Sequence, residues 1–346
     1  HAFPYVAINL FGSAIFLCAC GLAYVTFGTL NLAEISVRAA LLGDDLRVPL
    51  LALLFIVVFG IKAGLFPLYY WLPNSYPTAP HPTAALFAGL LTKVGVYVLL
   101  RVFATALPHD LTFAHTLLAW MAGLTMILAV LGAISRSFIR GILSFHILSQ
   151  IGFMVLAIGF FTPLSLAACV FYVTHHIVVK TSLFLIGGVV ARLNGTDNLE
   201  RTGNLWKHTP WLGVLFLFQA LSLAGLPPLS GFWGKYLIVV VGVEQRQYWL
   251  VAASLVASLL TLFSMLKIWN GAFWRASQAT VADVGRRWRA MTAVIAALTC
   301  VSLTIGLGAE AFMRLSRRAA EQALDQRAYA QAVLGYLGKA SGGPPP

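Results

Sequence analysis

Long apolar runs alternate with short polar segments along nearly the whole chain. Each run is close to the roughly 20 residues that a helix needs to cross a bilayer. None shows the alternation of apolar and polar residues that marks strands of a membrane barrel, so helices are expected. The nine predicted membrane segments are Tyr5–Leu30, Val48–Leu72, Thr83–Ala106, His115–Ile134, Ile142–Phe161, Leu164–Leu193, Trp211–Gly242, Tyr248–Phe273 and Ala290–Ala311. The pattern predicts an all-α fold, a polytopic transmembrane helical bundle.

Two of these segments contain helix-breaking residues. The break residues are Gly60, Gly64 and Pro67 in the second segment and Gly225, Pro227 and Pro228 in the seventh. Proline lacks a backbone donor and clashes with the preceding turn, so each helix is expected to be discontinuous. A broken helix at membrane depth requires protein or a water-filled cavity to satisfy its freed backbone groups. Paired breaks in two halves of a chain are typical of transport sites.

Composition agrees with a membrane protein and excludes several other classes. Charged residues make up 10% of the 346 residues, against about 25% in soluble domains. The net charge of +12 comes largely from short loops: those after the even-numbered segments hold nine Lys and Arg, the others four. This bias places the even-numbered loops in the cytoplasm and argues against nucleic acid as a partner. The four cysteines lack CxxC spacing and no phosphate-binding loop occurs, so no metal and no cofactor is expected.

Charged and titratable side chains inside the apolar runs are the candidate functional residues. A charge at the bilayer centre costs about 2.5–3.5 kcal/mol and usually marks an ion pathway. The candidate proton and cation pathway is Lys62, Lys93, His146, His176, Lys180, Lys235 and Lys267. Lys267, near a helix end, could instead extend to the headgroups. His175 fits a packed or hydrogen-bonded histidine better than a relay member, and His146 fits either role equally.

The spacing of these residues indicates an internal repeat. Lys62 and Lys93 are 31 residues apart, and Lys235 and Lys267 are 32 apart. In both pairs the first lysine lies on a broken segment and the second on the next helix, as in the duplicated units of many transporters. His176 and Lys180 are four residues apart, so they share a helix face and can exchange a proton directly or through water.

The two ends of the chain carry further expectations. The segment Phe312–Gly338 is amphipathic, which predicts a helix at the membrane interface or on a partner. The last residues, Gly342–Pro346, are expected to be disordered. The sequence starts at His1 without a methionine, so residues are expected to precede it in a longer polypeptide.

Four stretches resemble the antiporter-like family, the large membrane subunits of respiratory complex I, membrane-bound hydrogenases and Mrp antiporters. They are Gly60-Ile61-Lys62-Ala63-Gly64-Leu65-Phe66-Pro67, Leu91-Thr92-Lys93-Val94-Gly95, His176 through Lys180, and Pro227-Pro228 through Gly234-Lys235. A lysine at position 235, the stretch Phe263–Trp269 and the tail Tyr329–Gly335 are similar to Mrp D subunits.

The resemblance implies a fold of fourteen helices with two inverted five-helix repeats, of which the nine segments would be helices six to fourteen. Residues 1–107 would then end the first repeat with three helices, 108–274 form the second with five, and 275–346 hold the last helix and tail. The N-terminal helices would be missing, including a fifth-helix glutamate that pairs with Lys62. Because five buried lysines have no mid-membrane acid in this sequence, an acid from elsewhere is expected to face Lys62.

The function implied is Na⁺/H⁺ exchange by a secondary transporter subunit, not an enzyme, in a hetero-oligomeric complex of a prokaryotic plasma membrane. The lipid bilayer, other subunits, Na⁺ and H⁺ would be its partners. The alternative is a proton-pumping membrane subunit of complex I or a related hydrogenase, which would use the same residues. A scaffold with silent lysines is a third class, and it predicts that Lys62 and Lys93 tolerate alanine.

Overall fold

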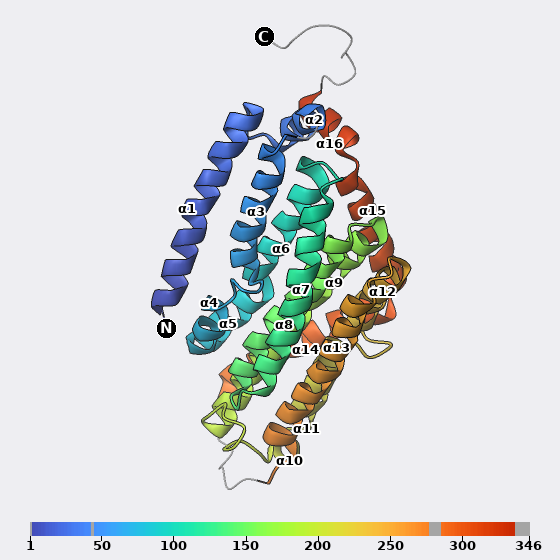
Figure 1. The fold of residues 1–346 in the computed structure, drawn as a ribbon. Helices are drawn as coiled ribbons and strands as arrows, with labels where there is room; N and C mark the ends of the chain where they lie inside the picture. The colour runs from blue at the N-terminus through green and yellow to red at the C-terminus, as the bar shows by residue number, and fades with distance from the viewer. Residues whose placement is uncertain (1, 43–44, 277–284, 336–346) are drawn as a thin grey trace.

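The computed structural model describes residues 2–42, 45–276 and 285–335, and these form a bundle of helices (Figure 1). Seven helical stretches are long and apolar enough to cross a membrane. They are α1 (Ala2–Phe27), the stretch His81–Ala106, α7 (Thr112–Ile134), α8 (Ile139–Phe160), α9 (Pro163–Asn194), the stretch Tyr248–Trp274, and α14 (Gly285–Leu307) from Arg289 on. The all-α membrane fold predicted from the sequence is confirmed.

Two of the composite stretches contain π-helical turns. His81–Ala106 consists of α5 (His81–Leu86), the π-helical turn η2 (Phe87–Leu91), α6 (Thr92–Arg101) and the π-helical turn η3 (Val102–Ala106). Tyr248–Trp274 consists of α13 (Tyr248–Trp269) and the π-helical turn η4 (Asn270–Trp274). Such turns are rare and gather at functional sites.

Two predicted segments are not single membrane-spanning helices, so the expected count of nine is corrected to seven among the described residues. In place of Val48–Leu72 the chain forms α3 (Arg47–Ala63), which ends before Gly64. In place of Trp211–Gly242 it forms α11 (Pro210–Ala224) and α12 (Ser230–Glu244). The physical reason is the same in both, since a glycine in the left-handed region followed by proline ends the helix.

The ends of α3 and α11 share one hydrogen-bond pattern. Gly64 and Gly225 have φ values of 87° and 91°, a region that disfavours residues with a Cβ atom. The amides of Gly64 and Leu65 both donate to Gly60, and those of Gly225 and Leu226 both donate to Leu221. Lys62 precedes its break glycine whereas Lys235 follows Gly225, so the two lysines lie on opposite sides of equivalent breaks.

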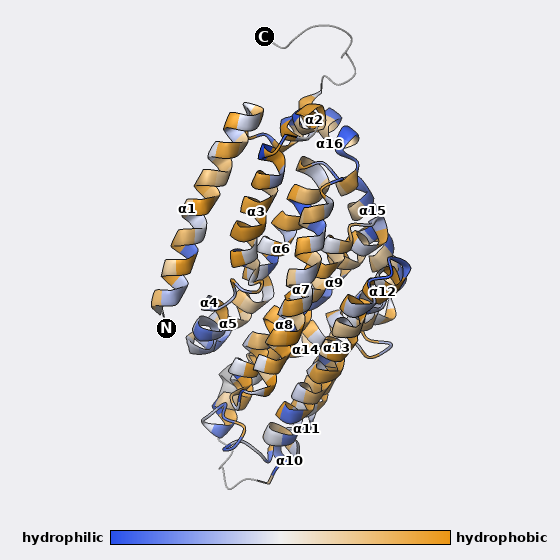
Figure 2. Ribbon diagram, in the orientation of Figure 1, coloured by the Kyte–Doolittle hydropathy of each residue, from blue (hydrophilic) through white to orange (hydrophobic). Residues whose placement is uncertain are grey.

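Helix α8 forms the centre of the bundle, and α1 lies at its edge (Figure 1). In the most apolar part of α8, 94% of residues are buried, against 17% in α1. A helix that is apolar all round is buried on every side, which is why α8 shows no polar face. Figure 2 shows apolar residues along the length of the bundle and hydrophilic ones at its ends and along the C-terminal helices. The exposed apolar side of α1 faces lipid or another chain.

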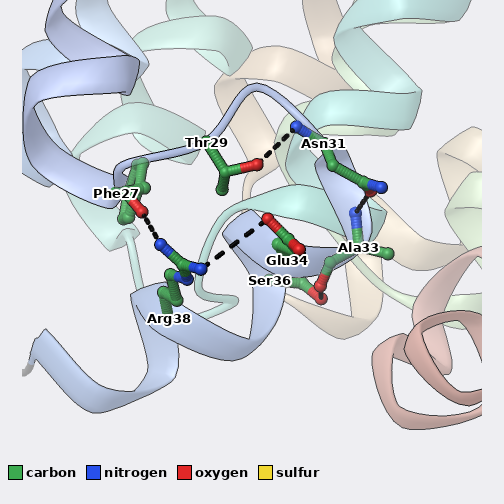
Figure 3. A network of polar contacts seen from close by, with 7 residues as sticks. All are labelled: Phe27, Thr29, Asn31, Ala33, Glu34, Ser36 and Arg38. Atoms are coloured by element: carbon green, nitrogen blue, oxygen red, sulfur yellow. Dashed lines mark hydrogen bonds and ion pairs between the residues drawn. The ribbon is translucent and has the colours of Figure 1, made fainter. Parts of the chain in front are cut away.

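The connection between α1 and α2 (Leu32–Leu42) is fixed by side chains (Figure 3). Arg38 donates to the Phe27 carbonyl at 2.5 Å and lies 3.8 Å from the Glu34 carboxylate. Asn31 accepts from the Ala33 amide at 2.9 Å, which satisfies one of the free donors at the start of α2.

The opposite end of the bundle is held by an ion pair and a short backbone bridge. Arg140 donates to the Asp197 carboxylate at 2.7 Å, and both side chains are largely buried. The amides of Ile139 and Leu199 donate to Asp197 and Ser137 across the same contact, so the loop after α7 is tied to the loop after α9. The short helices α4 (Trp71–Ser75), η1 (Tyr76–Thr78) and α10 (Leu205–His208) complete the connections.

The amphipathic tail packs on its own chain. Helix α15 (Ala309–Leu324) lies against α9 through Met313, Ala320 and Ala323, and α16 (Gln326–Leu334) lies against α2. Gln326 donates to the carbonyls of Ala104 and Leu107. The apolar face predicted for an interface or a partner is therefore covered within the chain. The predicted disordered end, Gly342–Pro346, lies outside the described residues.

Candidate functional site

The predicted pathway residues lie on six elements that pack in succession across the bundle. Lys62 is on α3, Lys93 on α6, His176 and Lys180 on α9, His146 on α8, Lys235 on α12 and Lys267 on α13. Helix α6 contacts α3, α8 and α9, and both α12 and α13 contact α8. Lys93, Lys180, Lys235 and the two histidines are buried, while Lys62 and Lys267 are partly exposed.

Lys62 forms the first point of this succession. Its ammonium group donates to Asn9 Oδ1 at 2.9 Å, and Asn9 in turn donates to the Tyr5 carbonyl. Lys62 lines a groove of about 350 Å³ that runs between α1, α3 and α6. Because the groove is open, a side chain of another subunit has space to reach Lys62 there.

The helices that carry Lys62 and Lys93 approach each other unusually closely. A Cβ atom on Gly95 would lie 2.5 Å from the Ala63 amide nitrogen and 3.0 Å from the Lys62 carbonyl carbon. Only a residue without a side chain fits there, because the neighbouring atoms are backbone. Gly95 thus brings α6 onto α3 next to both lysines.

Lys93 is bound by the π-helical turn that precedes it. Its ammonium group donates to the Ala88 carbonyl within η2 and to Thr92 Oγ1 at 3.3 Å. A π-helical turn shifts the local i→i−4 pattern, which leaves carbonyl groups available to side chains. The backbone itself therefore supplies the partner that a buried lysine needs.

Helix α9 places His176 and Lys180 together in the centre of the bundle. Lys180 donates to the Leu143 carbonyl of α8 at 3.1 Å. Both ring nitrogens of His176 are buried without a partner. The charges of Lys93, Lys180 and Lys235 act on His176, so it lies electrostatically between the two halves of the succession. An imidazole without partners is free to take up and release a proton through water.

Helix α8 contributes His146 and a group that the sequence reading missed. His146 Nε2 bonds to Ser264 Oγ of α13, one helical turn from Lys267. Gln150 accepts from the Tyr172 hydroxyl at 2.5 Å and donates to Thr261 Oγ1 at 3.4 Å. A glutamine inside the apolar run of α8 was the available signal for this second polar link.

Lys235 and Lys267 donate to carbonyls at helix ends. Lys235 bonds to Leu223 and Ala224, the last residues of α11, at 3.0 and 3.1 Å. Lys267 bonds to Ile134 and Arg136 at the end of α7, at 2.9 and 2.7 Å. The last carbonyls of a helix have no partner in the helix and carry partial negative charge. Lys267 thus binds protein groups at the edge of the bundle and remains partly exposed.

The lysines are therefore neutralised by carbonyls and by an amide oxygen within the described part of the chain. All four ion pairs formed by those residues use arginine, and none lies on the lysine succession. No group of three or more metal-ligating side chains occurs among them either. His175 is hydrogen-bonded, through Nδ1, to Ser230 Oγ at 2.7 Å.

Comparison with known proteins gives one consistent family. Residues 2–261 match the family described as NADH:quinone oxidoreductase/Mrp antiporter, TM. The chain is 42% identical over 334 residues to the Na⁺/H⁺ antiporter D subunit of Alkalihalophilus pseudofirmus, which covers 96% of this chain and 68% of that protein. The chain therefore spans about two thirds of the length of this relative.

Solved structures agree with the sequence match. A chain in the Mrp complex from Dietzia sp. DQ12-45-1b superposes with a TM-score of 0.88 at 33% identity, covering 96% of this chain and 69% of that one. A chain of respiratory complex I from Thermus thermophilus gives 0.79 at 27% identity, covering 93% and 68%. The chain is a multi-pass membrane protein that belongs to the NADH:quinone oxidoreductase/Mrp antiporter family, and within that family it is of the Mrp D type.

Proposed function

We propose that this chain is part of a monovalent cation/proton antiporter of a prokaryotic plasma membrane and that it exchanges Na⁺ for H⁺ as one subunit of a hetero-oligomeric complex. Protons pass along Lys62, Lys93, His176, Lys180, His146 and Lys235, with Lys267 toward the exit. The chain is a transporter subunit and not an enzyme. The names of its relatives support this reading, since they are antiporter subunits.

One observation carries the proposal: buried lysines and histidines on successive helices, each held by a neutral oxygen or by no partner. A lysine held by a carboxylate keeps its proton, whereas one held by a carbonyl in a low-dielectric interior gives it up more readily. Adding a proton to one lysine also repels charge from the next, because such couplings are strong at low dielectric. The arrangement therefore favours stepwise proton movement.

Exchange in vesicles that contain the whole complex tests this function. A Na⁺ pulse should dissipate an imposed proton gradient, and Lys93→Met should abolish that response while the complex assembles normally. Lys207→Met, which changes an exposed lysine of α10, is the matched control and should exchange like wild type. Proton pumping that follows quinone-dependent NADH oxidation, without a response to Na⁺, would instead support the complex I alternative.

A further inference from the structure

We propose that the break between α11 and α12 holds a binding site for a monovalent cation, in which Na⁺ and the protonated Lys235 compete for the same oxygen atoms. The inference rests on the proposed antiport function and deepens it, because it assigns a place to the exchanged cation. Helix ends and unwound backbone are the groups that bind Na⁺ in broken-helix transporters.

The first two ligands are the carbonyls that now accept from Lys235. Leu223 and Ala224 end α11, and both bond to the ammonium group of Lys235. Gly225 makes this possible, since a Cβ atom there would lie 2.8 Å from Lys235 Cδ. An ammonium group and Na⁺ both carry one positive charge, so one can replace the other at these oxygens without changing the charge of the site.

Three hydroxyl groups lie beside these carbonyls on three different helices. Ser230 Oγ is 2.8 Å from Ser222 Oγ of α11 and 3.1 Å from Ser302 Oγ of α14. All three serines are buried. Ser222 directly precedes the two carbonyl ligands, and Gly231 packs onto its carbonyl because it has no side chain. Buried hydroxyls from three helices around one helix break form a set of neutral oxygen ligands.

A histidine nitrogen without a partner is aimed at the same place. His175 is fully buried, and its Nδ1 bonds to Ser230 Oγ, whereas its Nε2 has no partner. A Cβ atom on Gly231 would lie 3.0 Å from that Nε2 atom, which places it against the start of α12. If Nδ1 carries the proton and donates to Ser230, Nε2 presents a lone pair toward the break.

A polar seam between α11 and α14 leads from the serines along the bundle. Gln219 Nε2 donates to Thr299 Oγ1 at 3.0 Å, one helical turn from Ser222 and Ser302. Gln219 Oε1 and Thr292 Oγ1, further along the same helices, are buried without a hydrogen-bond partner. Orphaned buried oxygens are costly, and a passing dehydrated cation would satisfy both.

The charges around the site favour a monovalent ion. The titratable groups that act on or with Lys235 are His146, His175 and His176, which are all bases. Helices α8, α9, α11, α13 and α14 contain no Asp or Glu, and the acid of α12 is Glu244 at its far end. Divalent cations such as Ca²⁺ rely on carboxylate ligands, so neutral oxygens select single charges.

Radioactive Na⁺ binding to the purified whole complex, together with the KM for Na⁺ in vesicle exchange, tests the site. The double variant Ser222→Ala/Ser302→Ala should raise that KM at least tenfold, leave kcat within twofold and lose one bound Na⁺ per complex. Ser302→Thr keeps a hydroxyl and should restore most of the affinity. Ser254→Ala on α13, whose hydroxyl bonds only within its own helix, is the matched control.

Competition gives a second readout. In Lys235→Met the complex should still bind Na⁺ at this site, and its affinity should no longer fall when the pH is lowered from 9 to 7. An unchanged KM and stoichiometry in the double serine variant, with normal exchange, would overturn the cation site and leave the antiport function standing. Bound Na⁺ in a wild-type complex that fails to exchange it would have the opposite meaning.

Discussion

Replacing Gly95 by alanine should separate the helices that carry Lys62 and Lys93. The new Cβ atom would lie 2.5 Å from the Ala63 amide nitrogen, whereas ordinary van der Waals contact begins at 3.4 Å, so α6 must move by about 0.9 Å. Overpacking of this kind costs about 1–3 kcal/mol. A displacement near 1 Å at a reacting group can lower a rate about 10²-fold. We therefore expect exchange to fall by about that factor with a modest loss of stability.

The assay is Na⁺-driven dissipation of a proton gradient in vesicles that contain the whole complex, alongside thermal unfolding followed by size-exclusion chromatography. Gly21→Ala in α1 is the matched control, because nothing lies within 4 Å of the added Cβ atom. It should leave exchange unchanged. Wild-type exchange in Gly95→Ala, at an equal amount of assembled complex, would refute the idea that the close α3–α6 contact sets the distance between the two lysines.

Three other substitutions separate proton transfer from structure. Lys93→Met keeps the side-chain volume and removes a charge that costs about 2.5–3.5 kcal/mol to bury, so assembled yield should hold while exchange is lost; exchange at the wild-type rate would remove Lys93 from the pathway. Lys235→Arg keeps its proton at any pH below about 12, so exchange should fall at least tenfold between pH 7 and 9, and Lys235→Glu should stop it; normal turnover in both variants would make Lys235 structural. Asp197→Asn breaks the charged hydrogen bond from Arg140 and should lower the free energy of unfolding by about 1.5–3 kcal/mol, which the reciprocal exchange Arg140→Asp/Asp197→Arg should partly restore; no loss on chemical denaturation would contradict this.

The sequence was sufficient for the fold class and for the places where helices end. Apolar runs of bilayer length leave the backbone no choice but helices, so the all-α bundle followed from composition and spacing. Gly64 and Gly225 were equally readable, because glycine followed by proline ends a helix whatever surrounds it. The limits of the two repeats, and the acid expected to face Lys62, remain predictions.

Only the tertiary structure decided what each buried lysine binds. A lysine in an apolar run signals that some partner exists, but the partner of Lys235 is a carbonyl twelve residues away across a turn, and that of Lys180 belongs to another helix. His175 looked like a packing residue until Ser222, Ser230 and Ser302 came together beside it from three helices. Local pattern fixes where a helix begins and ends, because backbone geometry is local. Contacts between side chains depend on how helices cross, and that is set by the packing of the whole bundle.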